Sequence, residues 1–196
     1  METEKKMGIY IDLNNVEYGL ADYNCCGMSL DYSLLATELS KGYRLSVLNV
    51  YDCTVKKDST RAPLHKILED AGMTLKLYVP HVFTDEYGKP VVHQKEVDTA
   101  ITTDVSWDLA LGEVDVAVIV SGDRDMHPAL MRAAQHGHEV RIVSPKQSIS
   151  DSYLESLGEC TFIEDMDVFL VYGKDREEVQ FNVATFRVME GVEAHE

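Results

Sequence analysis

The sequence is poor in several features that mark large classes of protein. Its 196 residues include a single tryptophan and four cysteines, Cys25, Cys26, Cys53 and Cys160. The cysteines form no CxxC pair and have no zinc-like spacing, so we interpret them as reduced thiols of a reducing compartment. No apolar run approaches a membrane span, and the opening METEKKMGIYID lacks a signal-peptide pattern. We therefore expect a cytoplasmic protein with no membrane partner.

Basic residues are also scarce. Lysine and arginine number 18 against 34 aspartates and glutamates, which gives a net charge of −16 at pH 7. This balance argues against a general nucleic-acid coat protein, because phosphate binding is driven mainly by cations. It is compatible with a site that holds cations through clustered acids. From Pro145 onward, acidic residues outnumber basic ones, which is usually no more than a solvated face.

Apolar runs alternate along the chain with segments of helical periodicity. We expect strands at residues 7–12, 43–51, 73–79, 114–120 and 138–143, and a short edge strand at 160–163. Helices are expected at about 31–40, 62–71, 95–111, 126–136 and 147–157. This alternation predicts an α/β fold with a mostly parallel central sheet, a Rossmann-like three-layer sandwich over residues 1–165. Residues 166–196 form an acidic C-terminal extension whose segments 169–172 and 179–188 could pair as strands, extend the sheet or contact a second subunit, as in a homodimer.

The segment VDVAVIVSGDRD, residues 114–125, organises the rest of the chain. Its apolar, β-branched run is typical of a strand buried on both faces, and it breaks at Ser121-Gly122. Asp123 and Asp125 follow at the point where the next helix begins. In open α/β sheets this edge is where ligands bind.

Two further acids are predicted to reach the same edge. Asp12 ends the first strand, and Asp98 lies in the first turn of the helix that begins at residue 95. Taken singly, each acid has a structural explanation as a cap, a dipole partner or an Asx turn. Together with Asp123 and Asp125 they would repel one another unless cations neutralise them, and their hard oxygen atoms suit Mg²⁺ or Mn²⁺. Such a site is suited to phosphodiester hydrolysis.

Three motifs carry a family resemblance that covers roughly residues 7–163. IDLNN, KEVDTAITTD and SGDRDMHPALMRAAQHGHEVRIV resemble the NYN domain, the LabA-like branch of the PIN-like nuclease superfamily. The matching positions are Asp12, Asn15, Lys95, Val97, Asp98, Asp104, Ser121, Gly122, Asp123, Asp125, Pro128 and Gly137. Met126 replaces the family's phenylalanine. The resemblance implies a PIN-like sandwich, a Mg²⁺ or Mn²⁺ site and an RNA-cleaving or RNA-processing role.

The resemblance also implies a role for each matched polar residue. The metal-binding or catalytic carboxylates would be Asp12, Asp98, Asp123 and Asp125. Groups that orient the acids or a phosphate would be Asn15, Ser121 and Asp104. Asp104 lies about 120° around the helix from Asp98, so it could instead stabilise packing or a loop.

Basic and aromatic residues near the same edge could bind a substrate. The candidate phosphate-binding residues are Lys56, Lys57, Arg61, Lys95 and Arg124, although for each an ordinary solvated position is the alternative. Tyr18, Tyr23 and Tyr87 could stack a single-stranded base, with core or surface roles as alternatives.

Three functions are consistent with these residues. The first is a metal-dependent ribonuclease that cleaves RNA phosphodiester bonds at the aspartate cluster. The second is a non-catalytic regulatory or interaction module that keeps the fold. The third is a metal-dependent phosphatase, since similar acids serve many chemistries.

Overall fold

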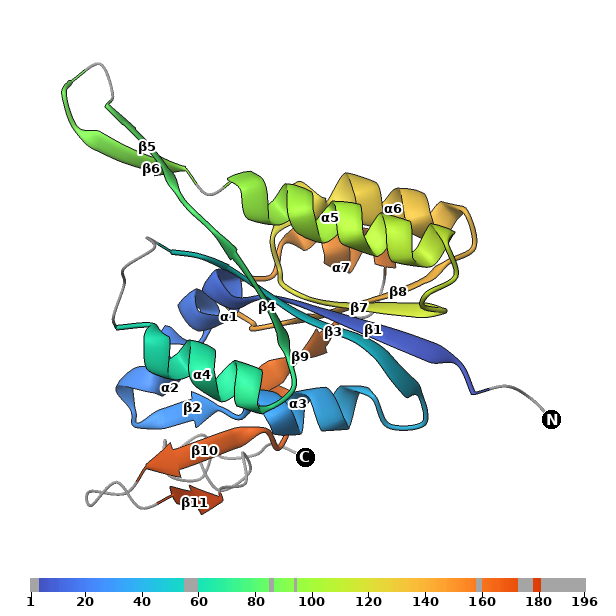
Figure 1. The fold of residues 1–196 in the computed structure, drawn as a ribbon, viewed down its shortest axis with the longest axis horizontal. Helices are drawn as coiled ribbons and strands as arrows, with labels where there is room; N and C mark the ends of the chain where they lie inside the picture. Colours follow the sequence, from blue (N-terminus) through green and yellow to red (C-terminus); the bar gives the residue numbers. More distant parts are fainter. Residues whose placement is uncertain are drawn as a thin grey trace.

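A six-stranded parallel sheet forms the centre of the molecule (Figure 1). The computed structural model describes residues 4–54, 60–84, 87–93, 95–157, 160–172 and 178–180. The strand order is β4-β3-β1-β7-β8-β9, and every neighbouring pair is parallel. These strands are β1 (Lys6–Asp12), β3 (Arg44–Cys53), β4 (Thr74–Tyr78), β7 (Val116–Val120), β8 (Glu139–Ser144) and β9 (Thr161–Phe162).

Helices cover both faces of this sheet, which confirms the predicted three-layer sandwich (Figure 1). One face carries α1 (Leu13–Gly19), α2 (Ala21–Cys25), α3 (Tyr32–Leu39) and α4 (Ala62–Asp70). The other face carries α5 (Lys95–Ala110), α6 (His127–Gln135) and α7 (Asp151–Leu157). Two 3-10 turns, η1 (Arg124–Met126) and η2 (Ile163–Asp165), complete the helical elements of the described residues.

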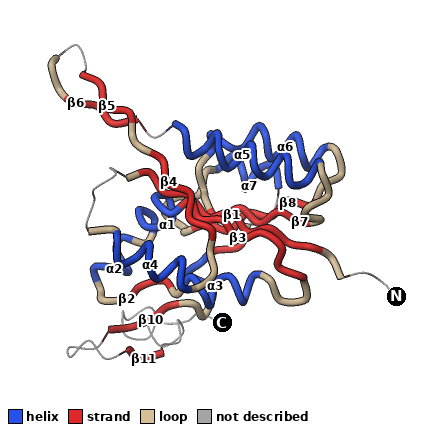
Figure 2. The backbone as a smooth tube through the Cα atoms, viewed as in Figure 1, coloured by secondary structure: helices blue, strands red, loops and turns tan. Residues whose placement is uncertain are grey.

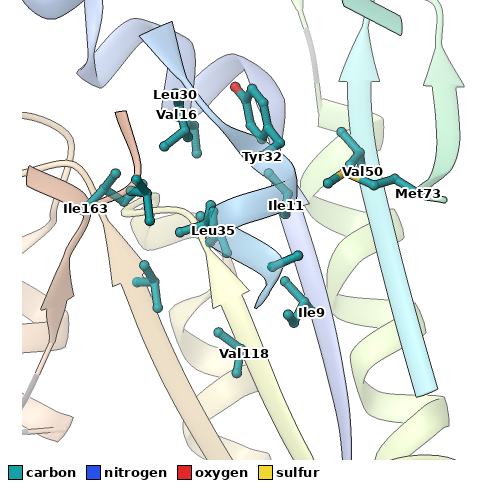
Figure 3. Close-up of a cluster of buried hydrophobic side chains, with 14 of the residues drawn as sticks. Ile9, Ile11, Val16, Leu30, Tyr32, Leu35, Val50, Met73, Val118 and Ile163 are labelled. Carbon is teal, nitrogen blue, oxygen red and sulfur yellow. The ribbon is translucent and has the colours of Figure 1, made fainter. Parts of the chain in front are cut away.

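Alternation along the strands divides the apolar residues between two cores. On β1, Ile9 and Ile11 join the cluster that contains Leu35 of α3 (Figure 3). Leu68 of α4 belongs to the same cluster. Tyr10, between them, belongs to the cluster beneath α5 and α6. Each central strand is therefore buried on both faces, as its continuous apolar sequence predicts.

The register of the central strands aligns their carboxyl ends. Ile11 on β1 pairs with Val120 on β7, so Asp12 and Ser121 are the next residues on neighbouring strands. Asp12 itself pairs with Tyr51 on β3. We call this end of the sheet the carboxyl edge. It brings the IDLNN and SGDRD motifs together although they are more than a hundred residues apart in sequence.

Two segments differ from the prediction, and a third agrees with a turn signal in the sequence. Residues 13–28, where the sequence pattern predicts no helix or strand, contain α1 and α2, because Leu13, Val16 and Leu20 pack into the core. Tyr87-Gly88, a pair that can turn a small hairpin, lies between β5 (His81–Thr84) and β6 (Pro90–His93), which pair antiparallel in a hairpin that projects from the body of the protein (Figure 2). The helix expected to start at residue 147 begins at Asp151.

A small second sheet forms beside α2 and α3. β10 (Phe169–Tyr172) pairs antiparallel with β2 (Met28–Leu30) on one side and with β11 (Glu178–Gln180) on the other. Phe169 is buried in the core and stacks on Tyr23 with ring centroids 5.2 Å apart. Of the predicted second segment, residues 181–188 lie outside the described residues.

Candidate active site

Three of the predicted acids line one cavity at the carboxyl edge. The cavity has a volume of about 340 Å³ and is lined by Asp12, Asn14, Asn15, Tyr18, Val97, Asp98 and Asp123. Asp12 ends β1, the two asparagines and Tyr18 belong to α1, Asp98 lies in the first turn of α5, and Asp123 follows β7. The convergence of acids from three separated segments is therefore present in the structure.

Asp12 is the innermost of these carboxylates, with 5% of its surface exposed. Its Oδ1 caps α1 by accepting a hydrogen bond from the Asn15 amide at 3.1 Å, and its Oδ2 accepts one from Ser121 Oγ at 3.2 Å. Burial raises the pKa of Asp12 to about 6, since the hydrogen bonds that favour the charged form only partly offset desolvation. The charge of Asp123 adds to the rise.

Asp98 lines the same cavity as Asp12, from the first turn of α5. Partial burial raises the pKa of Asp98 to about 7, and the charges of Asp123, Asp12 and Asp125 contribute in that order. The negative charges on these four residues therefore interact with one another. A cation bound among them would remove the repulsion and return both pKa values toward the ordinary range.

Hydrogen bonds to Asn15 and Ser121 fix the loop that follows β7. The Gly122 amide donates to Asn15 Oδ1 at 3.0 Å, and the Asp123 amide donates to Ser121 Oγ at 3.2 Å. Glycine is required at position 122, because a Cβ there would lie 2.2 Å from the carbonyl oxygen of Ser148. Asn15 and Ser121 thus hold in place the loop that carries Asp123.

Asp125 lies beside the cavity and is solvent-exposed. Its amide donates to Asp123 Oδ1 at 2.9 Å, which closes the Asx turn that the sequence also allowed. Its charge still reaches Asp98. Asp125 therefore belongs to the acidic cluster, at its solvent side.

The donor set fits a hard divalent cation. Carboxylate and amide oxygens are the ligands that Mg²⁺ and Mn²⁺ prefer, and the cavity offers both kinds. Within the described ranges, no three His, Cys, Asp or Glu side chains lie close enough together to hold a metal ion as they stand. The acids instead line an open cavity, which leaves room for water and for a substrate phosphate beside a cation.

Asp104 has a different position from the other matched acids. Its Oδ2 accepts hydrogen bonds from Tyr51 Oη at 2.5 Å and from Lys76 Nζ at 2.6 Å. It is not among the residues that line the cavity, and its bonds tie α5 to β3 and β4, which is the packing role that the sequence left open beside a site role. Asp108, one helical turn later, accepts a similar bond from Tyr10 Oη at 2.7 Å. Together these bonds fix the helix that carries Asp98.

The predicted basic residues have varied positions. Arg61 lies with its Nε 2.9 Å from Oδ2 of the fully buried Asp52, which His65 also contacts at 2.6 Å, so Arg61 is a structural residue and not a free phosphate ligand. Arg124 is exposed between the two acids of the loop. Lys95 is the first residue of α5. Lys56 and Lys57 lie outside the described residues.

Sequence reasoning missed two contributors to the site. Asn14 lines the cavity from the same helix as Asn15. Tyr153 of α7 donates from its hydroxyl to the Asp123 carbonyl at 2.8 Å and so fixes the loop from behind. Asn14 could have been found from its position next to Asn15, whereas nothing in the sequence connects Tyr153 with a loop thirty residues earlier.

Comparison with known proteins agrees with this geometry. The model of the NYN domain family matches residues 6–164. The chain belongs to the NYN domain family. A solved structure, a protein of unknown function from Vibrio parahaemolyticus RIMD 2210633, is similar to this NYN domain with a TM-score of 0.66 at 19% identity, over 84% of this chain and 98% of that one. No curated protein matches.

Family membership gives the site its general context. NYN domains belong to the PIN-like nuclease superfamily, whose members generally use divalent metals and act on nucleic acid. The structural neighbour supports the same fold. Among the described residues, no helix combines the length and apolarity needed to cross a membrane.

Proposed function

We propose that this NYN domain is a metal-dependent ribonuclease that hydrolyses phosphodiester bonds at the carboxyl edge of its sheet. Asp12, Asp98 and Asp123 would hold Mg²⁺ or Mn²⁺, with Asp125 at the solvent side. The observation that carries the proposal is the meeting of three carboxylates in one open cavity with Asn14 and Asn15.

Each residue has a distinct part in the proposed reaction. A bound Mg²⁺ or Mn²⁺ would supply activation of water and neutralisation of the charge that develops on the phosphate oxygens. The pKa values of Asp12 and Asp98 are raised by burial and by the neighbouring charges, and both carboxylates would be ionised when they hold the cation. Asn15 and Ser121 hold the loop and the Asp12 carboxylate in place. Arg124 is exposed beside the acids, where it can meet a substrate phosphate.

The test is cleavage of a panel of labelled single-stranded, hairpin and duplex RNAs with Mg²⁺, Mn²⁺ or EDTA. Asp123→Asn is compared with wild type, and Glu113→Gln serves as a matched control because it removes one charge from an exposed loop distant from the cavity. We expect metal-dependent cleavage by wild type and Glu113→Gln and none by Asp123→Asn. Cleavage that persists in Asp123→Asn would contradict the proposed site.

The same assay separates the alternatives. A phosphatase would hydrolyse small phosphate monoesters in a metal- and Asp123-dependent manner and leave internal RNA bonds intact. A non-catalytic module would cut nothing although it is folded, and it would keep its binding properties in Asp123→Asn. A homodimer and a cytoplasmic location stay predictions from the sequence, and the proposed chemistry requires neither.

A further inference from the structure

Tyr18 is an exposed aromatic residue at the cavity that holds the acids. Its side chain is 77% exposed, yet it is one of the residues that line the cavity. A large ring left in water at a site wall is available for stacking on a flat ligand.

The helix that carries Tyr18 is fixed firmly. Asp12 caps its start, and Leu13 and Val16 anchor its inner face in the core. Its last residue, Gly19, packs so closely on Pro145 that a Cβ would lie 2.6 Å from the proline Cβ. Tyr18 therefore projects from a backbone that cannot shift freely.

The spacing along α1 directs Tyr18 toward the cavity. Asn14 and Tyr18 are four residues apart and lie on one face of the helix, opposite the buried face. Val97 of α5 adds an apolar wall to the same cavity. An aromatic ring, an apolar side chain and an amide are the groups that bind a nucleobase by stacking and by its polar edge.

We propose that Tyr18 stacks on a nucleobase adjacent to the phosphate at the acids, which makes the site select unpaired nucleotides. This inference rests on the proposed ribonuclease function. A base inside a duplex is already stacked on its neighbours and cannot offer its face to Tyr18 without leaving the helix. Stacking also requires no positive charge, which suits a chain of net charge −16 whose Arg61 is engaged by Asp52. Because every base has a π face, the selection is for single strands and not for sequence.

The experiment compares Tyr18→Ala, Tyr18→Phe and Tyr18→Trp with wild type on one single-stranded RNA in the presence of the active metal. Trp107→Ala is the matched control, since it removes an exposed ring nine residues beyond Asp98 on α5. We expect Tyr18→Ala to raise KM about tenfold or more with a smaller change in kcat. The Phe and Trp variants should keep the wild-type KM, because the ring and not the hydroxyl makes the contact.

A second substrate series locates the stacked base. Single abasic positions are scanned along the RNA, and one of them should raise the wild-type KM as much as Tyr18→Ala does. That same abasic RNA should give no further loss with Tyr18→Ala, which shows that the two changes remove one contact. Additive losses would overturn the proposal.

Failure of this inference is distinguishable from failure of the ribonuclease function. If wild type cleaves RNA and Tyr18→Ala matches Trp107→Ala, the function stands and the stacking role is wrong. If wild type cleaves nothing, affinity for the same RNA is measured by fluorescence anisotropy with wild type and Tyr18→Ala. A lower affinity of Tyr18→Ala then supports the stacking contact in a binding module, and equal affinities or no binding overturn it.

Discussion

Substitution of Asp12 by asparagine should stabilise the metal-free protein at alkaline pH. Asparagine keeps an oxygen that can accept from the Asn15 amide, and asparagine is itself a favourable N-cap. Its amide group can also bond to Ser121 Oγ. The substitution therefore removes mainly the buried negative charge.

The size of the effect follows from the pKa of Asp12. Burial raises this pKa from 3.8 to about 6. A carboxyl that binds protons more tightly in the folded state contributes stability that is full below the unfolded pKa and is lost as pH rises through the folded pKa. The shift of roughly 2 units corresponds to about 3 kcal/mol, and about half of that remains at pH 5. Wild type should thus lose about 1.5 kcal/mol from this group between pH 5 and pH 8.

Urea unfolding in EDTA at pH 5 and pH 8 measures this difference. Relative to wild type, Asp12→Asn should gain stability on going from pH 5 to pH 8 by about 1.5 kcal/mol. Millimolar Mg²⁺ should shrink the advantage at pH 8, because the cation stabilises the wild-type carboxylates and loses a ligand in the variant. A difference between the two proteins that is the same at both pH values would refute the reasoning.

Three further predictions concern the support of the site. Tyr51→Phe removes the hydroxyl that bonds to Asp104 and should lower the free energy of unfolding by about 1–2 kcal/mol in urea titrations. Gly122→Ala forces a methyl group against the Ser148 carbonyl and should cost about 1–3 kcal/mol together with most of the cleavage activity. Thermal unfolding should show a rise in Tm with millimolar Mg²⁺ in wild type that is absent in Asp98→Asn, and an equal rise in both would exclude Asp98 as a ligand.

The sequence predicted those parts of the fold that local pattern determines. The β7 run, the Ser121-Gly122 break and the Asp123 position follow from apolar periodicity and turn chemistry, and the parallel topology then brings Asp12 and Asp98 to the same edge. The helix α1 escaped detection, because with seven residues it offers too few apolar positions to establish a period.

Contacts between residues far apart in the sequence could not be predicted from hydrophobic periodicity or motifs. Asp104 shares a motif with Asp98, and the helical repeat left its role open between packing and the site. Tyr51, which donates a hydrogen bond to Asp104, is 53 residues away in the sequence, and this bond supports the packing role. The sequence alone suggested that Arg61 was free to bind a phosphate, but the fold places its guanidinium group against the buried carboxylate of Asp52. In both cases the residue type suggested a role at the site. The structural role depends on the polar neighbour that the fold brings next to the side chain.

The most direct test of the account is the location of Mn²⁺ in crystals soaked at neutral pH, read from anomalous scattering with a parallel soak of Asp98→Asn. The account predicts a peak in the cavity within about 2.5 Å of carboxylate oxygens of at least two of Asp12, Asp98 and Asp123, and a weakened or missing peak in the variant. Mn²⁺ bound elsewhere on the molecule, with the cavity empty at saturating concentration, would contradict the claim that these acids form the metal site.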